Sequence, residues 1–103
     1  MAAHVLALYN APLDPTAFEQ YYHGTHVPLA KRLPGLRSYL VNKGALAFGG
    51  GSAPLYLVAV LAFDSMGSIA AALESPEGKA TVADLANFAT GGVTVAMYET
   101  EEL

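Results

Sequence analysis

A chain of 103 residues can bury one hydrophobic core but not two, so we expect residues 1–103 to form a single domain. Hydrophobic residues make up 53% of the chain and charged residues only 14%, which is an apolar composition for a small monomer. The net charge is −4, the five basic residues are scattered, and the chain has no cysteine, no apolar run of membrane-span length and no secretory signal. We therefore expect no nucleic-acid partner, no disulfide, no membrane contact and a cytoplasmic location.

The first half of the chain predicts a strand, a helix and a second strand. His4–Asn10 is a short apolar run that favours a strand. Asp14-Pro15 then supplies an N-cap and a first-turn proline for a helix that Pro34-Gly35 ends. Leu36–Asn42 alternates in polarity and predicts the second strand.

Within that helix, Phe18, Tyr22 and His26 are spaced four residues apart and therefore share one face. An apolar ring, a phenol and an imidazole on one face are more typical of a pocket wall than of a plain core. Pro28 lacks an N–H and crowds the carbonyl of Gly24, so we expect the helix to kink or break across Gly24–Pro28, with His26 inside the break.

The second half repeats this order after a glycine-rich stretch, Lys43–Pro54, which we expect to be a mobile loop. Its elements are a strand, two helical segments and a final strand, expected at Leu55–Phe63, from Asp64 or Ser65 to Ser75, at Glu77–Phe88 and at Val93–Glu99. The order β-α-β-β-α-β predicts an α+β, ferredoxin-like fold, in which helices cover one face of a four-stranded antiparallel sheet.

Two of the strands indicate a partner. Val5–Leu8 and Leu55–Phe63 are apolar at both odd and even positions, whereas a sheet with one solvated face should alternate. Both faces are therefore expected to be buried, and in a chain of this length a second copy is the simplest cover. We expect a homodimer formed through the sheet face.

These residues also match a known family. The run Phe18…Tyr22…His26-Val27-Pro28-Leu29, followed by Leu33-Pro34-Gly35-Leu36, resembles the EthD family of the dimeric α/β-barrel superfamily, named for a protein of ethyl tert-butyl ether degradation. Further matching residues extend the resemblance over nearly the whole chain: Phe63-Asp64-Ser65, Ser75-Pro76-Glu77, Ala83-Asp84 and Phe88. The resemblance implies a ferredoxin-like protomer whose sheet packs against a second copy. It implies less about activity, because relatives across the superfamily catalyse different reactions.

Three residues are candidates for catalysis. His26 is a general base or acid, or else a half-buried side chain that only satisfies the helix break. Tyr22, one turn earlier, could donate to a substrate oxygen or fix the His26 tautomer, or it could be a core aromatic residue. Asp84 would raise the pKa of His26 if it faced the same pocket, and would have no such role if it faced water.

The remaining candidates concern binding. Phe18, Phe88 and Leu29 are expected to form apolar walls that contact a small apolar or aromatic ligand. His23 and His26 could reach one metal ion, but no third ligand is evident, so we expect no metal site. A haem on His26 rests on superfamily analogy alone, and we expect no cofactor.

Two classes of function are compatible with these residues. The first is a small cofactor-independent enzyme of catabolic or secondary metabolism that acts by proton transfer, such as an isomerase, dehydratase or cyclase. The second is a non-catalytic protein of a degradation pathway whose pocket only binds a hydrophobic molecule.

Overall fold

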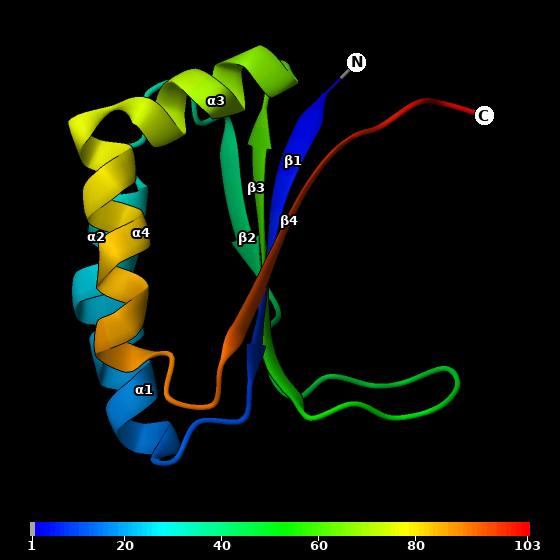
Figure 1. Ribbon diagram of the computed structural model, residues 1–103. Coiled ribbons are helices and arrows are strands. Elements are labelled where there is room, and N and C mark those ends of the chain that lie inside the picture. The colour runs from blue at the N-terminus through cyan, green and yellow to red at the C-terminus, as the bar shows by residue number, and fades with distance from the viewer. Residues whose placement is uncertain (1) are drawn as a thin grey trace.

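The computed structural model describes residues 2–103, which form a four-stranded sheet with helices on one side (Figure 1). The elements are, in chain order, β1 (Ala3–Asn10), α1 (Pro15–Tyr21), the π-helical turn η1 (Tyr22–His26), α2 (Val27–Ala30), β2 (Ser38–Val41), β3 (Leu55–Phe63), α3 (Met66–Glu74), α4 (Pro76–Phe88) and β4 (Val93–Glu99). The strands lie in the order β2-β3-β1-β4 and every neighbouring pair is antiparallel. This is the predicted ferredoxin-like arrangement.

The predicted bounds agree with the structure for β3 and β4, and β1 begins one residue early, at Ala3. β2 is shorter than the predicted strand and pairs with β3 over Ser38–Val41. The Arg37 N–H still donates to the Ala62 carbonyl (2.8 Å), so the backbone is aligned with β3 before the strand itself begins.

The predicted helix break is a π-helical turn instead. Asp14 caps α1 by accepting from the Ala17 N–H (3.2 Å), and the helix then continues without interruption into η1 and α2. In η1 the Val27 N–H donates to the Tyr22 carbonyl, five residues back. Because Pro28 has no N–H and its ring would meet the carbonyl four residues earlier, a wider turn accommodates it without ending the helix.

This turn keeps the functional face aligned. In an α-helix, side chains four residues apart differ in direction by about 40°, because four residues make slightly more than one turn. One wider π-helical turn reverses this rotation and brings the side chains back into line. Phe18, Tyr22, His26 and Ala30 are accordingly all buried, although each is four residues from the last. The sequence spacing therefore describes one continuous face through the turn.

The two helices of the second half meet at a close corner. Ser65 caps α3 by accepting from the Ser68 N–H (3.0 Å), and Ser75 caps α4 by accepting from the Gly78 N–H (3.0 Å). A Cβ on Gly78 would lie 2.0 Å from the Ala72 carbonyl oxygen, so only glycine fits at this corner.

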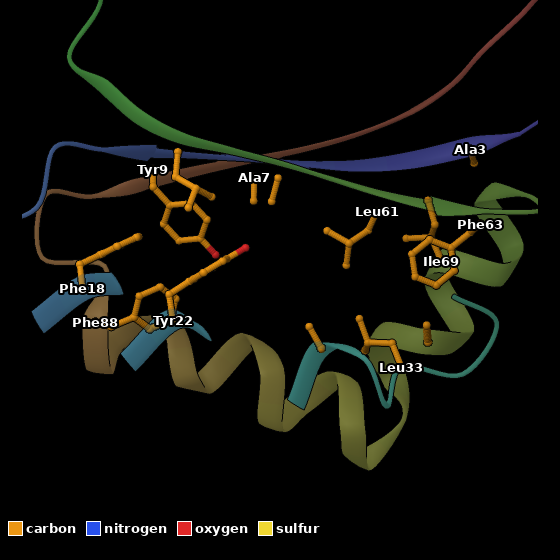
Figure 2. Close-up of a cluster of buried hydrophobic side chains, with 14 residues drawn as sticks. Ala3, Ala7, Tyr9, Phe18, Tyr22, Leu33, Leu61, Phe63, Ile69 and Phe88 are labelled. Carbon is orange, nitrogen blue, oxygen red and sulfur yellow. The ribbon is translucent and has the colours of Figure 1, made fainter. Parts of the chain in front are cut away.

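The core between sheet and helices has two ends of different character (Figure 2). At one end Tyr9 points from β1 toward the rings of Phe18, Tyr22 and Phe88, with ring centroids 5.6–5.7 Å from its own. The other end is filled mainly by aliphatic side chains, among them Leu33, Leu61 and Ile69, together with Phe63.

The opposite face of the sheet carries no helix (Figure 1). The register places Leu6 of β1 and Leu40 of β2 on either side of Val60 of β3, and Leu40 is 63% exposed. His4 lies on the same face and stacks on Tyr98, with ring centroids 5.4 Å apart. Its Nδ1 atom is buried without a hydrogen-bond partner within residues 2–103. This apolar face is the one predicted to meet a second copy.

The Lys43–Pro54 segment has no helix or strand and extends away from the sheet on its uncovered side (Figure 1). Asn42 fixes its base, because the side-chain amide donates to the Gly44 carbonyl (2.8 Å) and its oxygen accepts from the Val58 N–H (2.8 Å). The mobility of this loop stays a prediction. None of the helices within residues 2–103 has the length and apolarity that a membrane crossing requires.

Candidate active site

A cavity of about 80 Å³ lies between the sheet and the helices, between the two ends of the core. It exists because small residues face each other there. Ala7 of β1 pairs directly with Ala59 of β3, and Ala30 of α2 lies among the same lining residues. Three alanines cannot fill the space that larger core residues would occupy.

His26 lines this cavity and is only 3% exposed. Its Nδ1 atom lies 2.9 Å from Oδ2 of Asp84, which is also buried. No hydrogen bond within residues 2–103 reaches Nε2, on the other side of the ring. The structure thus brings His26 and Asp84 together, which is one of the two arrangements that the sequence left open for Asp84.

Asp84 is held by three donors. The Tyr21 hydroxyl donates to its Oδ1 at 2.6 Å, and the Asn87 side-chain amide donates to the same oxygen at 3.0 Å. His26 occupies the other oxygen. Burial opposes ionisation of this carboxyl group, but the hydrogen bonds from Tyr21, Asn87 and His26 together outweigh burial and hold the pKa of Asp84 below its usual value.

The charge state of His26 follows from two opposed effects. Burial lowers the pKa of His26, and this outweighs the hydrogen bond and charge of Asp84, which raise it. The net direction is below the ordinary value of 6.5, so the ring is neutral at neutral pH. An ionised Asp84 can only accept, so Nδ1 carries the proton and Nε2 keeps a free lone pair.

Two tyrosines form a second polar group. The hydroxyls of Tyr22 and Tyr39 are 2.6 Å apart, and Tyr39 lines the cavity whereas Tyr22 is fully buried behind it. Burial raises the pKa of both phenols, so both keep their protons. Since one hydroxyl donates to the other, the Tyr39 hydroxyl can present its own proton to the cavity when Tyr22 is the donor.

Tyr22 does not bond to His26. The two rings stack, with centroids 5.6 Å apart, and the Nδ1 position that would fix the tautomer belongs to Asp84. Among the predicted wall residues, Phe18 and Phe88 lie in the aromatic end of the core, and Phe88 packs 4.6 Å from the His26 ring centroid. Leu29 is half-buried and lies outside the lining, where Ala30, four residues after His26, takes the inward position.

The cavity is closed by few side chains at one edge. Val82 of α4 and Val95 of β4 both line it and are 52% and 44% exposed. These residues mark the side from which a ligand would enter. A ligand the size of an aromatic ring would require side chains at this edge to move, because the cavity is smaller than those known to hold benzene.

Sequence reasoning missed Tyr21, Asn87 and Tyr39. Asn87 follows Asp84 by three residues on one helix, which is a spacing that could have indicated their contact. Tyr21 and Asp84 are 63 residues apart, and no local signal joins them. Within residues 2–103, no three His, Cys, Asp or Glu side chains converge in a way that could hold a metal ion.

Comparison with known proteins identifies the family. The EthD domain matches residues 10–92. The chain belongs to the EthD family. This EthD protein is 38% identical over 97 residues to an uncharacterized 11.0 kDa protein of the thcB–thcC intergenic region of Rhodococcus erythropolis, with 94% of this chain and 93% of that one covered. The crystal structure of an EthD family protein from Bacillus halodurans has a TM-score of 0.88 and 33% identity, covering 98% of this chain and 100% of that one.

More distant structures share the fold alone. A dimeric ferredoxin-like protein of unknown function from Thermobifida fusca has a TM-score of 0.69 at 17% identity, covering 97% of this chain and 92% of that one. SnoaB, a cofactor-independent oxygenase from Streptomyces nogalater, has a TM-score of 0.63 at 15% identity, covering 99% of this chain and 94% of that one. The predicted family and fold class are thereby confirmed, and the ferredoxin-like neighbours include dimeric proteins and a cofactor-independent oxygenase.

Proposed function

We propose that this EthD protein is a small cofactor-independent enzyme that acts by proton transfer on an apolar or aromatic oxygenated molecule. The observation that carries the proposal is the buried His26–Asp84 pair beside an apolar cavity. A neutral imidazole that is oriented by an ionised carboxylate, with its other nitrogen unbonded, has the arrangement of a general base. The cofactor-independent oxygenase from Streptomyces nogalater, which shares the fold, supports the idea of chemistry without a cofactor.

His26 acts first as a base and then as an acid. Its Nε2 takes a proton from a carbon next to a carbonyl group, and the electron pair stays on the ligand as an enolate. Asp84 stabilises the imidazolium that forms, because its carboxylate lies 2.9 Å from Nδ1. Return of the proton to another ligand atom completes an isomerisation, and its transfer to a departing hydroxyl group completes a dehydration.

Tyr39 holds the oxygen of the ligand. Tyr39 lines the cavity, and its hydroxyl can donate to the developing enolate while the Tyr22 hydroxyl supports it at 2.6 Å. Phe18 and Phe88 act at a distance from the ligand by packing the aromatic end of the core, where Phe88 contacts the His26 ring. Tyr21 and Asn87 are positioning residues for Asp84.

Deuterium exchange into a panel of model ligands tests this proposal. Small aryl ketones and lactones are incubated with the protein in deuterated water, and loss of the proton next to the carbonyl is followed by NMR. We expect the wild-type protein to accelerate exchange of a ligand that it binds, and we expect His26→Gln to reduce that rate by about a hundredfold or more. Glutamine retains hydrogen bonding but cannot take the proton near neutral pH.

Two controls make the result specific. Ala7→Val narrows the cavity while leaving the His26–Asp84 pair in place, so it should weaken ligand binding and exchange together. A folded His26→Gln protein with unchanged exchange would overturn the catalytic role. Ligand binding by wild type without any exchange would favour the second class of function, a non-catalytic ligand-binding protein of a degradation pathway.

We also propose that the uncovered sheet face binds a second copy of the chain. Its apolar residues and the exposed Leu40 support this, as do the dimeric ferredoxin-like neighbours. The lack of cysteine supports a cytoplasmic location.

A further inference from the structure

A second and larger hollow lies beneath the loop that joins β2 to β3. Its volume is about 450 Å³, which is within the range of small-molecule sites. One wall is apolar and includes Val41, Leu46, Phe48 and Leu55. Phe48 is 46% exposed, so its ring is available to a ligand.

The opposite wall carries a group of three polar side chains. The Tyr56 hydroxyl donates to Oε1 of Glu19 at 2.7 Å, and His23 Nε2 lies 3.2 Å from Oε2 of the same carboxylate. Glu19 is 44% exposed, and each of its oxygens can accept a further hydrogen bond. Among the residues that line the hollow, Glu19 is the only carboxylate, and neither lysine nor arginine is present.

This group repeats the arrangement around Asp84. In each case a carboxylate accepts from a tyrosine and contacts a histidine of the turn η1, His26 at the cavity and His23 at the hollow. The two sites are separated by packed aromatic rings, since Phe18 contacts Tyr56 on one side and Tyr22 on the other, at centroid distances of 5.4 and 5.6 Å.

The strand residues of the hollow lie on the face of the sheet that the helices cover. Val41 pairs with Ala59, and Leu57 pairs with Tyr9, and both of these partners lie on the face that the helices cover. The strand residues Val41 and Leu57 therefore face the hollow from the helix side of the sheet, as do Glu19 and His23, and the loop residues Leu46 and Phe48 complete it.

We propose that this hollow is a second binding site, for a small amphipathic molecule that carries a protonated amine. The ammonium group binds Glu19, whose carboxylate is already fixed by Tyr56 and His23 and has no lysine or arginine partner in the wall. The apolar body of the ligand lies against Leu46, Leu55 and the exposed ring of Phe48.

A set of three probes with similar apolar bodies tests the site: phenethylamine, phenethyl alcohol and hydrocinnamate. Binding to the full chain is followed by amide NMR titration near neutral pH. We expect phenethylamine to bind most tightly and to shift resonances of the loop and of Tyr56. Glu19→Gln should weaken amine binding by about two- to fivefold and leave the alcohol unaffected, because an exposed ion pair contributes up to about a factor of five.

Two further variants locate the site. Phe48→Ala should weaken all probes, since it removes apolar contact, whereas His26→Gln should leave amine binding unchanged. Equal binding of phenethylamine and hydrocinnamate, full amine affinity in Glu19→Gln, or loss of amine binding in His26→Gln would each overturn the proposal. Because Glu19 is half-exposed, Glu19→Gln is expected to fold, and Tyr56→Phe provides a second test of the same carboxylate.

Discussion

The ionisation of His26 connects the stability of this protein to its proposed chemistry. Burial lowers the pKa of His26 more than Asp84 raises it, so the folded state prefers the neutral ring. This preference keeps Nε2 unprotonated, so that it can act as a base, and it also means that protonation of His26 at low pH destabilises the folded state. From the sequence, the Asp84 carboxylate is expected to raise the pKa of His26, and burial is the effect that reverses the direction.

We predict that acidification destabilises the protein through His26. The unfolded chain binds this proton near pH 6.5 and the folded chain only at lower pH. The contribution of His26 to the free energy of unfolding is therefore fully present above pH 6.5 and is lost as pH decreases through the folded pKa. Asp84 adds a second loss below 3.8, because its pKa is also lowered. Urea unfolding at a series of pH values measures both losses.

His26→Gln is the matched variant for this measurement. It should remove the decrease that begins at pH 6.5 and keep the one below 3.8. A wild-type protein whose stability rises on acidification from neutral pH would show that His26 is charged in the folded state.

At the scale of elements, the glycines of η1 and α4 differ in their surroundings. A Cβ on Gly24, within the turn η1, would meet no atom within 4 Å. A Cβ on Gly78 would lie 2.0 Å from the Ala72 carbonyl oxygen at the α3–α4 corner. The first glycine is therefore not required by packing, and the second is.

We predict opposite effects for the two alanine variants. Gly24→Ala should stabilise the protein by about 0.5–1 kcal/mol, because alanine restricts the unfolded chain and favours helical structure. Gly78→Ala should cost more than about 2 kcal/mol, because backbone atoms of α3 must move. Thermal unfolding of both variants measures the difference, and equal stabilities would contradict the close packing at this corner.

The elements that could be predicted from sequence are those with strong local signals. Leu55–Phe63 is a continuous apolar run, and Ser75-Pro76 is a cap followed by a first-turn proline, so these bounds agree with the structure to within a residue. Pro28 predicted a kink or break across Gly24–Pro28, whereas the structure has a π-helical turn within a continuous helix. A sequence does not distinguish these outcomes, because they depend on packing against α4.

The candidate site could be predicted only in part for a related reason. Phe18, Tyr22 and His26 share a face by spacing alone, and that face is buried. The approach of Tyr21 to Asp84 and of Tyr22 to Tyr39 depends on how the helices and β2 pack together. The cavity itself results from the pairing of Ala7 with Ala59, which needs the strand register.

For the whole molecule, the uncovered sheet face predicts how the chain assembles. Leu40→Asp places a charge on that face at a position that is 63% exposed, so the isolated fold should tolerate it. We predict that the wild-type protein sediments as a dimer that buries more than about 1,000 Å² and that Leu40→Asp sediments as a monomer.

Leu13→Asp is the control for this prediction. Leu13 is 86% exposed and lies before α1, away from the uncovered sheet face, so the variant should remain dimeric. A wild-type monomer at micromolar concentration would contradict the proposed interface, and dissociation of both variants would place the interface elsewhere.

The charge and tautomer of His26 decide whether it can act as a base, and NMR of the imidazole nitrogens across a pH titration measures both directly. We predict a neutral ring at neutral pH that is protonated on Nδ1, with a pKa below 6.5 that falls further in Asp84→Asn, because the carboxylate that raises it is removed. A neutral ring that is protonated on Nε2, or a ring that carries both protons at neutral pH, would contradict the proposed role, because Nε2 would then have no free lone pair for a ligand proton.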